Sequence, residues 1–225
     1  MLSVKPSSSP SPLISRPNRG QKLALSLVLA VGIPLSLIED SEAQRIWDGP
    51  ALSFSNIELG YERHFFDEPG LDDADGFHLG LSIAPIPLLY FAGDFRYATA
   101  DQFLADIDEV DFMQARAGAG LRATLLGSLA VYTEGGFAYG KFDPVGSRNR
   151  YDGAGFYVEP GLKLGLFGRL EASIAGDLMV LDDETILGLK GGLMLGITDH
   201  FGISLDAGTS DHGDDYLGVG VRFSW

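Results

Sequence analysis

Two of the four histidines lie near residue types that hydrolytic enzymes use. His78 and Ser82 fall on the same side of an alternating segment, and a serine nucleophile needs a histidine base within hydrogen-bond reach. Four residues of strand rise separate them by roughly 13 Å, which is too far for a direct bond. His212 follows Asp211 in an acidic stretch, as in a histidine–aspartate pair. Dipeptides of this kind are common by chance, so we predict no catalytic residues.

Carboxylates also gather in four segments, 67–75, 101–109, 182–184 and 211–215. A calcium ion takes about six to eight oxygen ligands, which clustered carboxylates can supply. The stretch 106–111 offers carboxylates at alternate positions but lacks the glycine of an EF-hand loop. We therefore predict no dedicated metal site and no cofactor. The clusters are expected to form a solvated acidic rim that shares divalent cations.

Other charges alternate with apolar residues, so in extended strands they would face one side. Buried charges persist only when they are paired, and eight acidic against six basic residues favour a ladder of ion pairs. A pore with weak cation preference and a ligand pocket are the alternatives. The residues predicted to line this interior are Glu58, Glu62, Asp94, Arg96, Arg116, Arg122, Glu134, Glu159, Lys163, Lys190 and Arg222, and Glu171, Asp177 and Asp206 share their pattern.

The last ten residues show which kind of strand carries these charges. Large apolar side chains occupy every second position and alternate with glycine, arginine and serine. A barrel in lipid needs this pattern, because its apolar side faces outward and its small or polar side faces the lumen. The apolar positions, which we predict to form a C-terminal assembly signal, are Leu217, Val219, Val221, Phe223 and Trp225.

The same alternation divides the chain into ten segments. Each is close to the roughly nine to eleven residues that a tilted strand needs to cross a bilayer. We therefore predict an all-β fold, a closed antiparallel transmembrane barrel of ten strands over 53–225. Eight strands, with one hairpin outside the barrel, are the alternative. The segments are 53–65, 76–84, 88–98, 111–124, 128–141, 153–166, 169–180, 185–197, 202–209 and 216–225.

Short and long connections alternate between these segments. Short periplasmic turns and longer external loops are typical of outer-membrane barrels, and an even strand count places both chain ends on the periplasmic side. Each strand that descends from a long loop begins with an acidic residue and soon reaches glycine. These acidic residues are Asp75, Asp111, Asp152, Glu184 and Asp215.

The repeated acidic starts and the terminal aromatic residue together resemble the small bacterial outer-membrane β-barrel superfamily. The resemblance is to its opacity-type and porin-like ten-stranded members, and it covers roughly residues 53–225. It implies the fold and the membrane. It implies little about function, because that family is mostly of unknown role. One departure is that only Asp75-Gly76-Phe77 shows the aspartate-glycine-aromatic start intact.

Residues 1–43 have the features of a cleaved secretory signal. Basic residues up to Lys22 precede the apolar run Leu23–Ile38, and Ser41-Glu42-Ala43 fits the small-x-small cleavage rule. The run is short for a helix that spans a bilayer, which takes about 20 residues, so an uncleaved anchor is the weaker alternative. Residues 44–52 would then form a periplasmic lead before the first strand.

Composition limits the partners of the chain. Its 225 residues include no cysteine and carry a net charge of −15. This excludes disulfides and a cysteine-linked lipid anchor, and it argues against nucleic acid. The expected partners are outer-membrane lipid, lipopolysaccharide, the barrel-assembly machinery through the C-terminal strand, and loop-bound divalent cations.

The sequence therefore predicts a protein of the cell outer membrane. Its expected role is non-enzymatic, as a porin-like or structural surface protein with an ion-paired lumen and acidic loops. A narrow channel for ions or small solutes is one alternative. A loop-based adhesin and an outer-membrane hydrolase are the others.

Overall fold

The structure is a computed structural model, and all described elements belong to the predicted barrel. The signal segment 1–43 and residues 44–51 of the lead lie outside the described residues. Within the described residues, no helix is long and apolar enough to cross a membrane. The described ranges are 52–66, 72–102, 107–125, 128–142, 150–166, 169–182 and 184–225.

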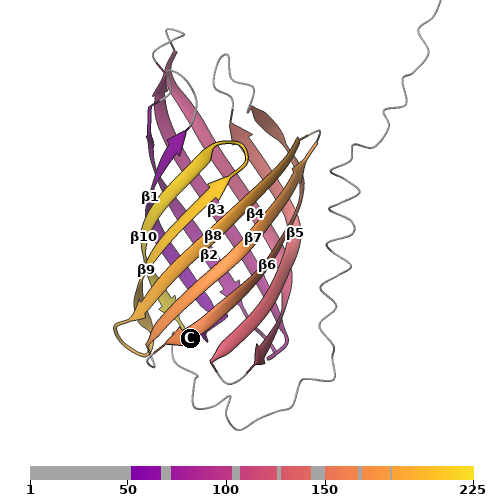
Figure 1. The fold of residues 1–225 in the computed structure, drawn as a ribbon, viewed down its shortest axis with the longest axis vertical. Helices are drawn as coiled ribbons and strands as arrows, with labels where there is room; N and C mark the ends of the chain where they lie inside the picture. The colour runs from indigo at the N-terminus through magenta and orange to yellow at the C-terminus, as the bar shows by residue number, and fades with distance from the viewer. Residues whose placement is uncertain are drawn as a thin grey trace, which may run out of the picture. The chain divides into compact units, whose positions relative to one another are not determined.

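Ten antiparallel strands form one closed sheet, in which each strand pairs with its neighbours in sequence and β1 pairs with β10 (Figure 1). The prediction of ten strands is confirmed, and the alternative of eight strands is wrong. The strands are β1 (Asn56–Phe66), β2 (Ala74–Ile83), β3 (Leu89–Gln102), β4 (Ile107–Leu125), β5 (Leu129–Phe142), β6 (Tyr151–Leu166), β7 (Leu170–Leu181), β8 (Glu184–Gly196), β9 (Phe201–Ser210) and β10 (Asp214–Ser224).

Closure explains how such a sheet can stand in lipid. The β1–β10 ladder runs from Asn56 opposite Ser224 to Phe66 opposite Asp214. No strand therefore has a free edge, and every ladder group can pair within the sheet, as the hydrocarbon layer demands. The start of β1 and the end of β10 lie at the same end of the barrel. We call that end the turn rim and the opposite end, which carries the longer connections, the loop rim.

The β3–β4 hairpin differs from its prediction. Residues 99–110 were expected to form a loop, but β3 continues to Gln102 and β4 begins at Ile107. The extension is possible because inward-facing Ala98, Ala100 and Val110 bury their side chains in the apolar cluster at this end. The packing of these side chains inside the barrel therefore favours a hairpin longer than the alternation pattern alone predicts.

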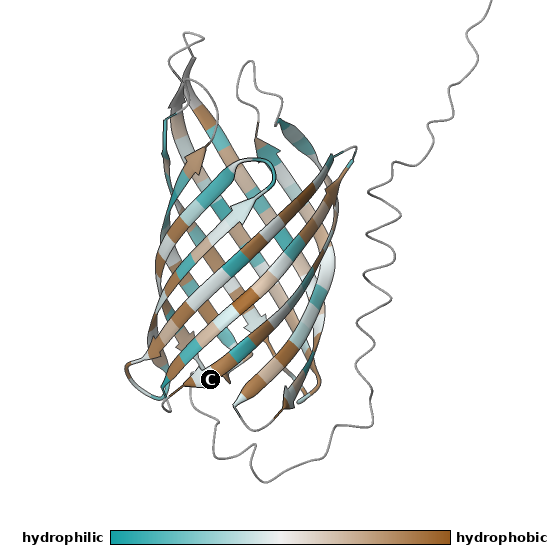
Figure 2. Cartoon of the chain, viewed as in Figure 1, coloured by the Kyte–Doolittle hydropathy of each residue, from teal (hydrophilic) through white to brown (hydrophobic). Residues whose placement is uncertain are grey.

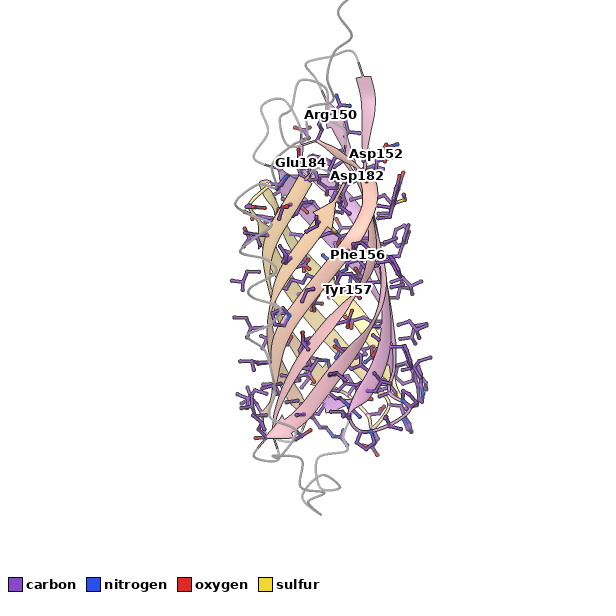
Figure 3. The ribbon with its side chains drawn as sticks, turned by 90° about the vertical axis from the view of Figure 1, so that its right-hand side faces the viewer. Arg150, Asp152, Phe156, Tyr157, Asp182 and Glu184 are labelled. Carbon is purple, nitrogen blue, oxygen red and sulfur yellow. The ribbon has the colours of Figure 1, made fainter. Side chains whose placement is uncertain are left out.

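Alternation separates an apolar outside from a mixed inside, and Figure 2 shows brown and teal residues alternating along the strands. Phe156 and Tyr157 are neighbours on β6 (Figure 3) and show the contrast, with exposures of 63% and 1%. The five apolar positions of the C-terminal segment are exposed on the outer face. In a membrane protein, these exposed side chains meet lipid.

The lumen is filled in three layers. A loop-rim apolar layer is built from Ala74, Ala98, Ala100, Val110, Phe112, Ala138, Phe142, Tyr151, Tyr157, Met179, Leu181 and Ile186, with Phe66 packed against it. A turn-rim aromatic layer contains Phe54, Tyr90, Ala130, Tyr132 and Ala175. The charged residues lie between the two layers.

The acidic residues that begin descending strands have a structural role at the loop rim. In three hairpins, a tyrosine of the ascending strand donates a hydrogen bond to the aspartate across the loop. The pairs are Tyr61–Asp75 (2.5 Å), Tyr97–Asp111 (2.7 Å) and Tyr139–Asp152 (3.0 Å). Tyrosine at the lipid–water boundary is favourable because its ring is apolar and its hydroxyl is polar.

Candidate lumenal site

The charged middle of the lumen surrounds a cavity of about 220 Å³. Ten of the eleven predicted interior residues line it, because they occupy the alternate strand positions whose side chains point inward. The exception is Arg122, which lies nearer the turn rim. Its guanidinium stacks 4.5 Å from the ring centre of Phe54, and its Nε donates to the carbonyl oxygen of Pro87 at 2.8 Å.

One side of this layer is a compact set of ion pairs, the Arg116 cluster. Arg116 contacts Asp94 at 3.0 Å, Glu159 at 3.1 Å and Asp177 at 3.3 Å. Lys190 contacts Glu159 at 2.7 Å and Asp177 at 3.5 Å. Every carboxylate of the cluster therefore has at least one basic partner, which is the condition for keeping charges in a poorly hydrated interior.

The other side is the His78 cluster, formed by Glu58, Glu62, His78, Ser204 and Asp206. The imidazole of His78 lies between two carboxylates, with Nδ1 3.1 Å from Glu62 and Nε2 3.5 Å from Glu58. Ser204 donates a hydrogen bond to Glu58. Among the described residues, no basic group lies within ion-pair distance of Asp206.

Ion pairs continue from the His78 cluster in both directions along the lumen. Toward the turn rim, Arg222 contacts Glu58 at 2.7 Å and Glu171 at 3.3 Å, and Lys163 contacts Glu171 at 3.5 Å. Toward the loop rim, Glu62 lies 3.4 Å from His64. His64 in turn contacts Asp214 at 2.8 Å. Arg96 joins the two clusters, at 3.7 Å from Glu62 and 3.6 Å from Asp94.

Glycine makes room for this arrangement. His78 stands on β2 and reaches over Gly60 of β1, where an added Cβ would overlap the imidazole ring. Ser204 stands on β9 and reaches over Gly220 of β10, where an added Cβ would lie 2.7 Å from the hydroxyl oxygen. Small residues on β1 and β10 thus allow side chains from β2 and β9 to converge on Glu58.

Comparisons with known proteins bear on the fold alone. No family model matches the chain, and no curated protein does. The chain is similar to the solved KdgM porin, with 10% identity and a TM-score of 0.43 over 75% of this chain and 99% of that one. It is similar to the outer membrane protein Ail of Yersinia pestis, with 17% identity and a TM-score of 0.41 over 76% and 99%. It is also similar to outer membrane phospholipase A of Escherichia coli, with 11% identity and a TM-score of 0.40 over 76% of this chain and 93% of that one.

The closed sheet and its apolar outer face decide the class. The chain is a closed ten-stranded β-barrel of the membrane-spanning type.

In this barrel, the two histidines weighed above as hydrolytic residues make other contacts. Ser82 donates its hydroxyl to the carbonyl oxygen of Phe54 at 2.7 Å, while His78 faces carboxylates. His212 lies at the loop rim, 3.0 Å from Asp211 and 3.6 Å from Glu184. Figure 3 shows Glu184 there with Asp152 and Asp182. Parts of the predicted acidic rim, at 67–71, 103–106 and 183, lie outside the described residues.

Sequence reasoning missed the His78 cluster as a unit. Parity places Glu58, His78, Ser204 and Asp206 on the inner face, and that signal was available. It does not reveal that closure of the barrel places β9 only two strands away from β1. The chain separation of about 150 residues between Glu58 and Asp206 hides their proximity.

Proposed function

We propose that this outer-membrane barrel is a non-conducting, non-enzymatic structural or surface protein with a closed, ion-paired lumen. The observation that carries the proposal is the pair of layers above and below the charged middle. A water-filled channel through a barrel needs a continuous open path, and barrels of about eight strands are normally filled by side chains.

At the turn rim, aromatic rings occupy the lumen. Phe54 leaves the line of β1 and packs against Tyr90 at 5.1 Å and Tyr132 at 6.0 Å between ring centres. Tyr90 and Tyr132 are 6.4 Å apart. Three mutually contacting rings, all buried, leave little room for an ion to pass at this end.

At the loop rim, a second group of rings lies across the lumen. Phe66 stacks on Phe142 at 4.8 Å and contacts Phe112 at 6.3 Å. Phe142 also contacts Tyr151 at 6.0 Å. An ion crossing this layer would have to leave its hydration shell among aromatic rings, which is strongly unfavourable.

Conductance tests the proposal. The refolded protein, shown to be folded by heat-modifiable gel mobility, is inserted into planar bilayers. We expect no unit steps over many insertions, because both layers block the lumen. Reproducible steps in the wild type would contradict the proposal. If their selectivity also changed in Arg116→Gln, they would assign the alternative, a narrow channel lined by the charged layer.

Export and insertion belong to the same proposal. Residues 1–43 are removed as a signal, and the outward apolar face of β10, from Leu217 to Trp225, is read by the barrel-assembly machinery. The expected N-terminus of the membrane form is Gln44. Trp225→Ala is expected to lower the amount of assembled barrel in cells while leaving refolding of purified protein possible. An N-terminus at residue 1 would contradict the first part, and unchanged assembly the second.

A further inference from the structure

We propose that Glu58, His78 and Asp206 bind one divalent transition-metal cation inside the lumen. These side chains come from β1, β2 and β9 and each directs one ligand atom to a common point, where the three atoms lie within 4.8 Å of one another. The site adjoins the 220 Å³ cavity, which offers space for additional water ligands. The inference does not depend on whether the barrel conducts.

Asp206 has the charge that a cation would balance. Its Oδ2 is buried and has no hydrogen-bond partner, and no lysine, arginine or histidine of the described ranges contacts it within ion-pair distance. A buried carboxylate without a partner is unfavourable. Asp206 is half-buried, and its Oδ2 is left without a partner beside the cavity that Glu58 and His78 also line.

His78 is oriented as a metal-binding histidine is. The residue is only 6% exposed. Its Nδ1 lies 3.1 Å from Glu62 Oε1 but without the geometry of a hydrogen bond, and its Nε2 lies 3.5 Å from Glu58 Oε1. Metal-bound histidines commonly use one nitrogen for the metal and the other for a carboxylate, which fixes the tautomer and the ring.

Glu62 supports this assignment independently. It is fully buried, yet neither of its carboxylate oxygens has a hydrogen bond of good geometry. Its nearest arginine or lysine among the described residues is Arg96, at a long 3.7 Å, and the imidazoles of His78 and His64 lie closer, at 3.1 and 3.4 Å. A metal ion on Nε2 would make the Nδ1 proton of His78 a stronger donor and would engage this carboxylate.

The spacing of His78 and Glu58 also fits two ligands of one ion. Their atoms Nε2 and Oε1 are 3.5 Å apart, longer than a strong hydrogen bond. Two ligands at about 2.0–2.1 Å from a tetrahedral ion are separated by about 3.4 Å. Arg222 occupies the other oxygen of Glu58, Oε2, at 2.7 Å. Oε1 accepts the hydrogen bond of Ser204 and faces His78, so a metal ion would use its second lone pair.

The charge of the whole middle layer favours a cation. Among the described residues, its eight carboxylates face five lysines and arginines, an excess of three negative charges when His78 is neutral, as a metal-bound imidazole is. The carboxylates are Glu58, Glu62, Asp94, Glu134, Glu159, Glu171, Asp177 and Asp206, and the bases are Arg96, Arg116, Lys163, Lys190 and Arg222. A divalent cation offsets two of the three charges.

The ligand types select the class of ion. One imidazole nitrogen and two carboxylate oxygens suit zinc, manganese and iron(II), whereas calcium takes oxygen ligands alone and more of them. Zn²⁺ is the appropriate probe, because it accepts this mixed set and has no redox chemistry.

The test measures Zn²⁺ bound per barrel. The full chain is refolded with Zn²⁺ present, so that closure of the lumen cannot prevent entry, and loosely bound ion is removed by gel filtration. We expect one retained ion per wild-type barrel by elemental analysis. Asp206→Asn and His78→Gln, each checked for folding by heat-modifiable mobility, are expected to retain none. Glu62→Gln is expected to weaken Zn²⁺ affinity roughly 10–100-fold.

Two matched variants separate this site from other acidic positions. Glu134→Gln alters a lumenal carboxylate on the opposite wall, and His212→Ala alters the loop-rim histidine; both are expected to retain one ion. The proposal is overturned if the folded wild type retains no Zn²⁺. It is also overturned if Asp206→Asn retains as much as the wild type, or if retention is lost only in His212→Ala.

Discussion

The Arg116 cluster and the His78 cluster occupy opposite walls of the same lumen and differ in how their carboxylates are paired. In the first, two bases serve three carboxylates through five contacts of 2.7 to 3.5 Å. In the second, Glu58 has a close arginine, Glu62 has only a distant one, and Asp206 has none. A histidine between two carboxylates takes the place of a second base.

The difference indicates that the two walls do different work. Ion pairs in a poorly hydrated interior are strongly coupled, and removing one partner leaves the others unpaired. The Arg116 cluster therefore holds the barrel wall together. The His78 cluster contains buried carboxylate oxygens, on Glu62 and Asp206, that have no hydrogen-bond partner. Unpaired oxygens of this kind are typical of ligand sites and not of structural ion pairs.

The largest expected effect is on the paired wall. Arg116→Met removes the base shared by Asp94, Glu159 and Asp177 and should lower the free energy of unfolding by about 3–5 kcal/mol. Denaturant titration in lipid vesicles measures the change. Arg63→Ala is the control, because its pair with Asp73 is exposed and exposed pairs contribute about 1 kcal/mol or less. Equal losses in the two variants would contradict the assigned role of the cluster.

A smaller loss of stability is expected at Gly60, where the His78 side chain packs closely against the backbone of β1. Gly60→Ala places a methyl group against the imidazole of His78, and such overpacking should cost about 1–3 kcal/mol. Gly176→Ala is the matched control. Nothing lies within 4 Å of its added Cβ, so stability should be unchanged or up to about 1 kcal/mol higher. Equal changes in the free energy of unfolding in the two variants would mean that the imidazole of His78 does not pack against Gly60.

Much of the barrel follows from the sequence because strand side chains have a period of two. Once Leu217 and Val219 are assigned to the lipid, Gly218 and Arg222 must face inward, and the same logic applies to Glu58 or Lys190. The strand number follows from counting such segments. Each of these inferences uses neighbours in the chain, which the sequence gives directly.

Contacts between distant strands do not follow in this way. His78 meets Glu58 and approaches Asp206 because β2, β1, β10 and β9 lie side by side in one register. The tyrosine–aspartate pairs of the loop rim depend on the same register across a hairpin. Nor does parity show that Phe54 turns away from the line of β1 into the lumen, since that depends on the rings it packs against.

The smallest expected change in the free energy of unfolding is that of Asp206→Asn, and it distinguishes the His78 cluster from the Arg116 cluster most sharply. Asp206→Asn in metal-free buffer should alter the unfolding free energy by no more than about 0.5 kcal/mol or raise it, because it removes an unpaired buried charge. Asp177→Asn makes the same substitution on the other wall, where Arg116 and Lys190 hold the carboxylate. It should cost about 1.5–3 kcal/mol, the range for hydrogen bonds to charged groups. Denaturant titrations of both variants, run side by side, decide the matter. A loss of 1.5 kcal/mol or more in Asp206→Asn would mean that Asp206 is held as firmly as Asp177, and the two walls would then be equivalent.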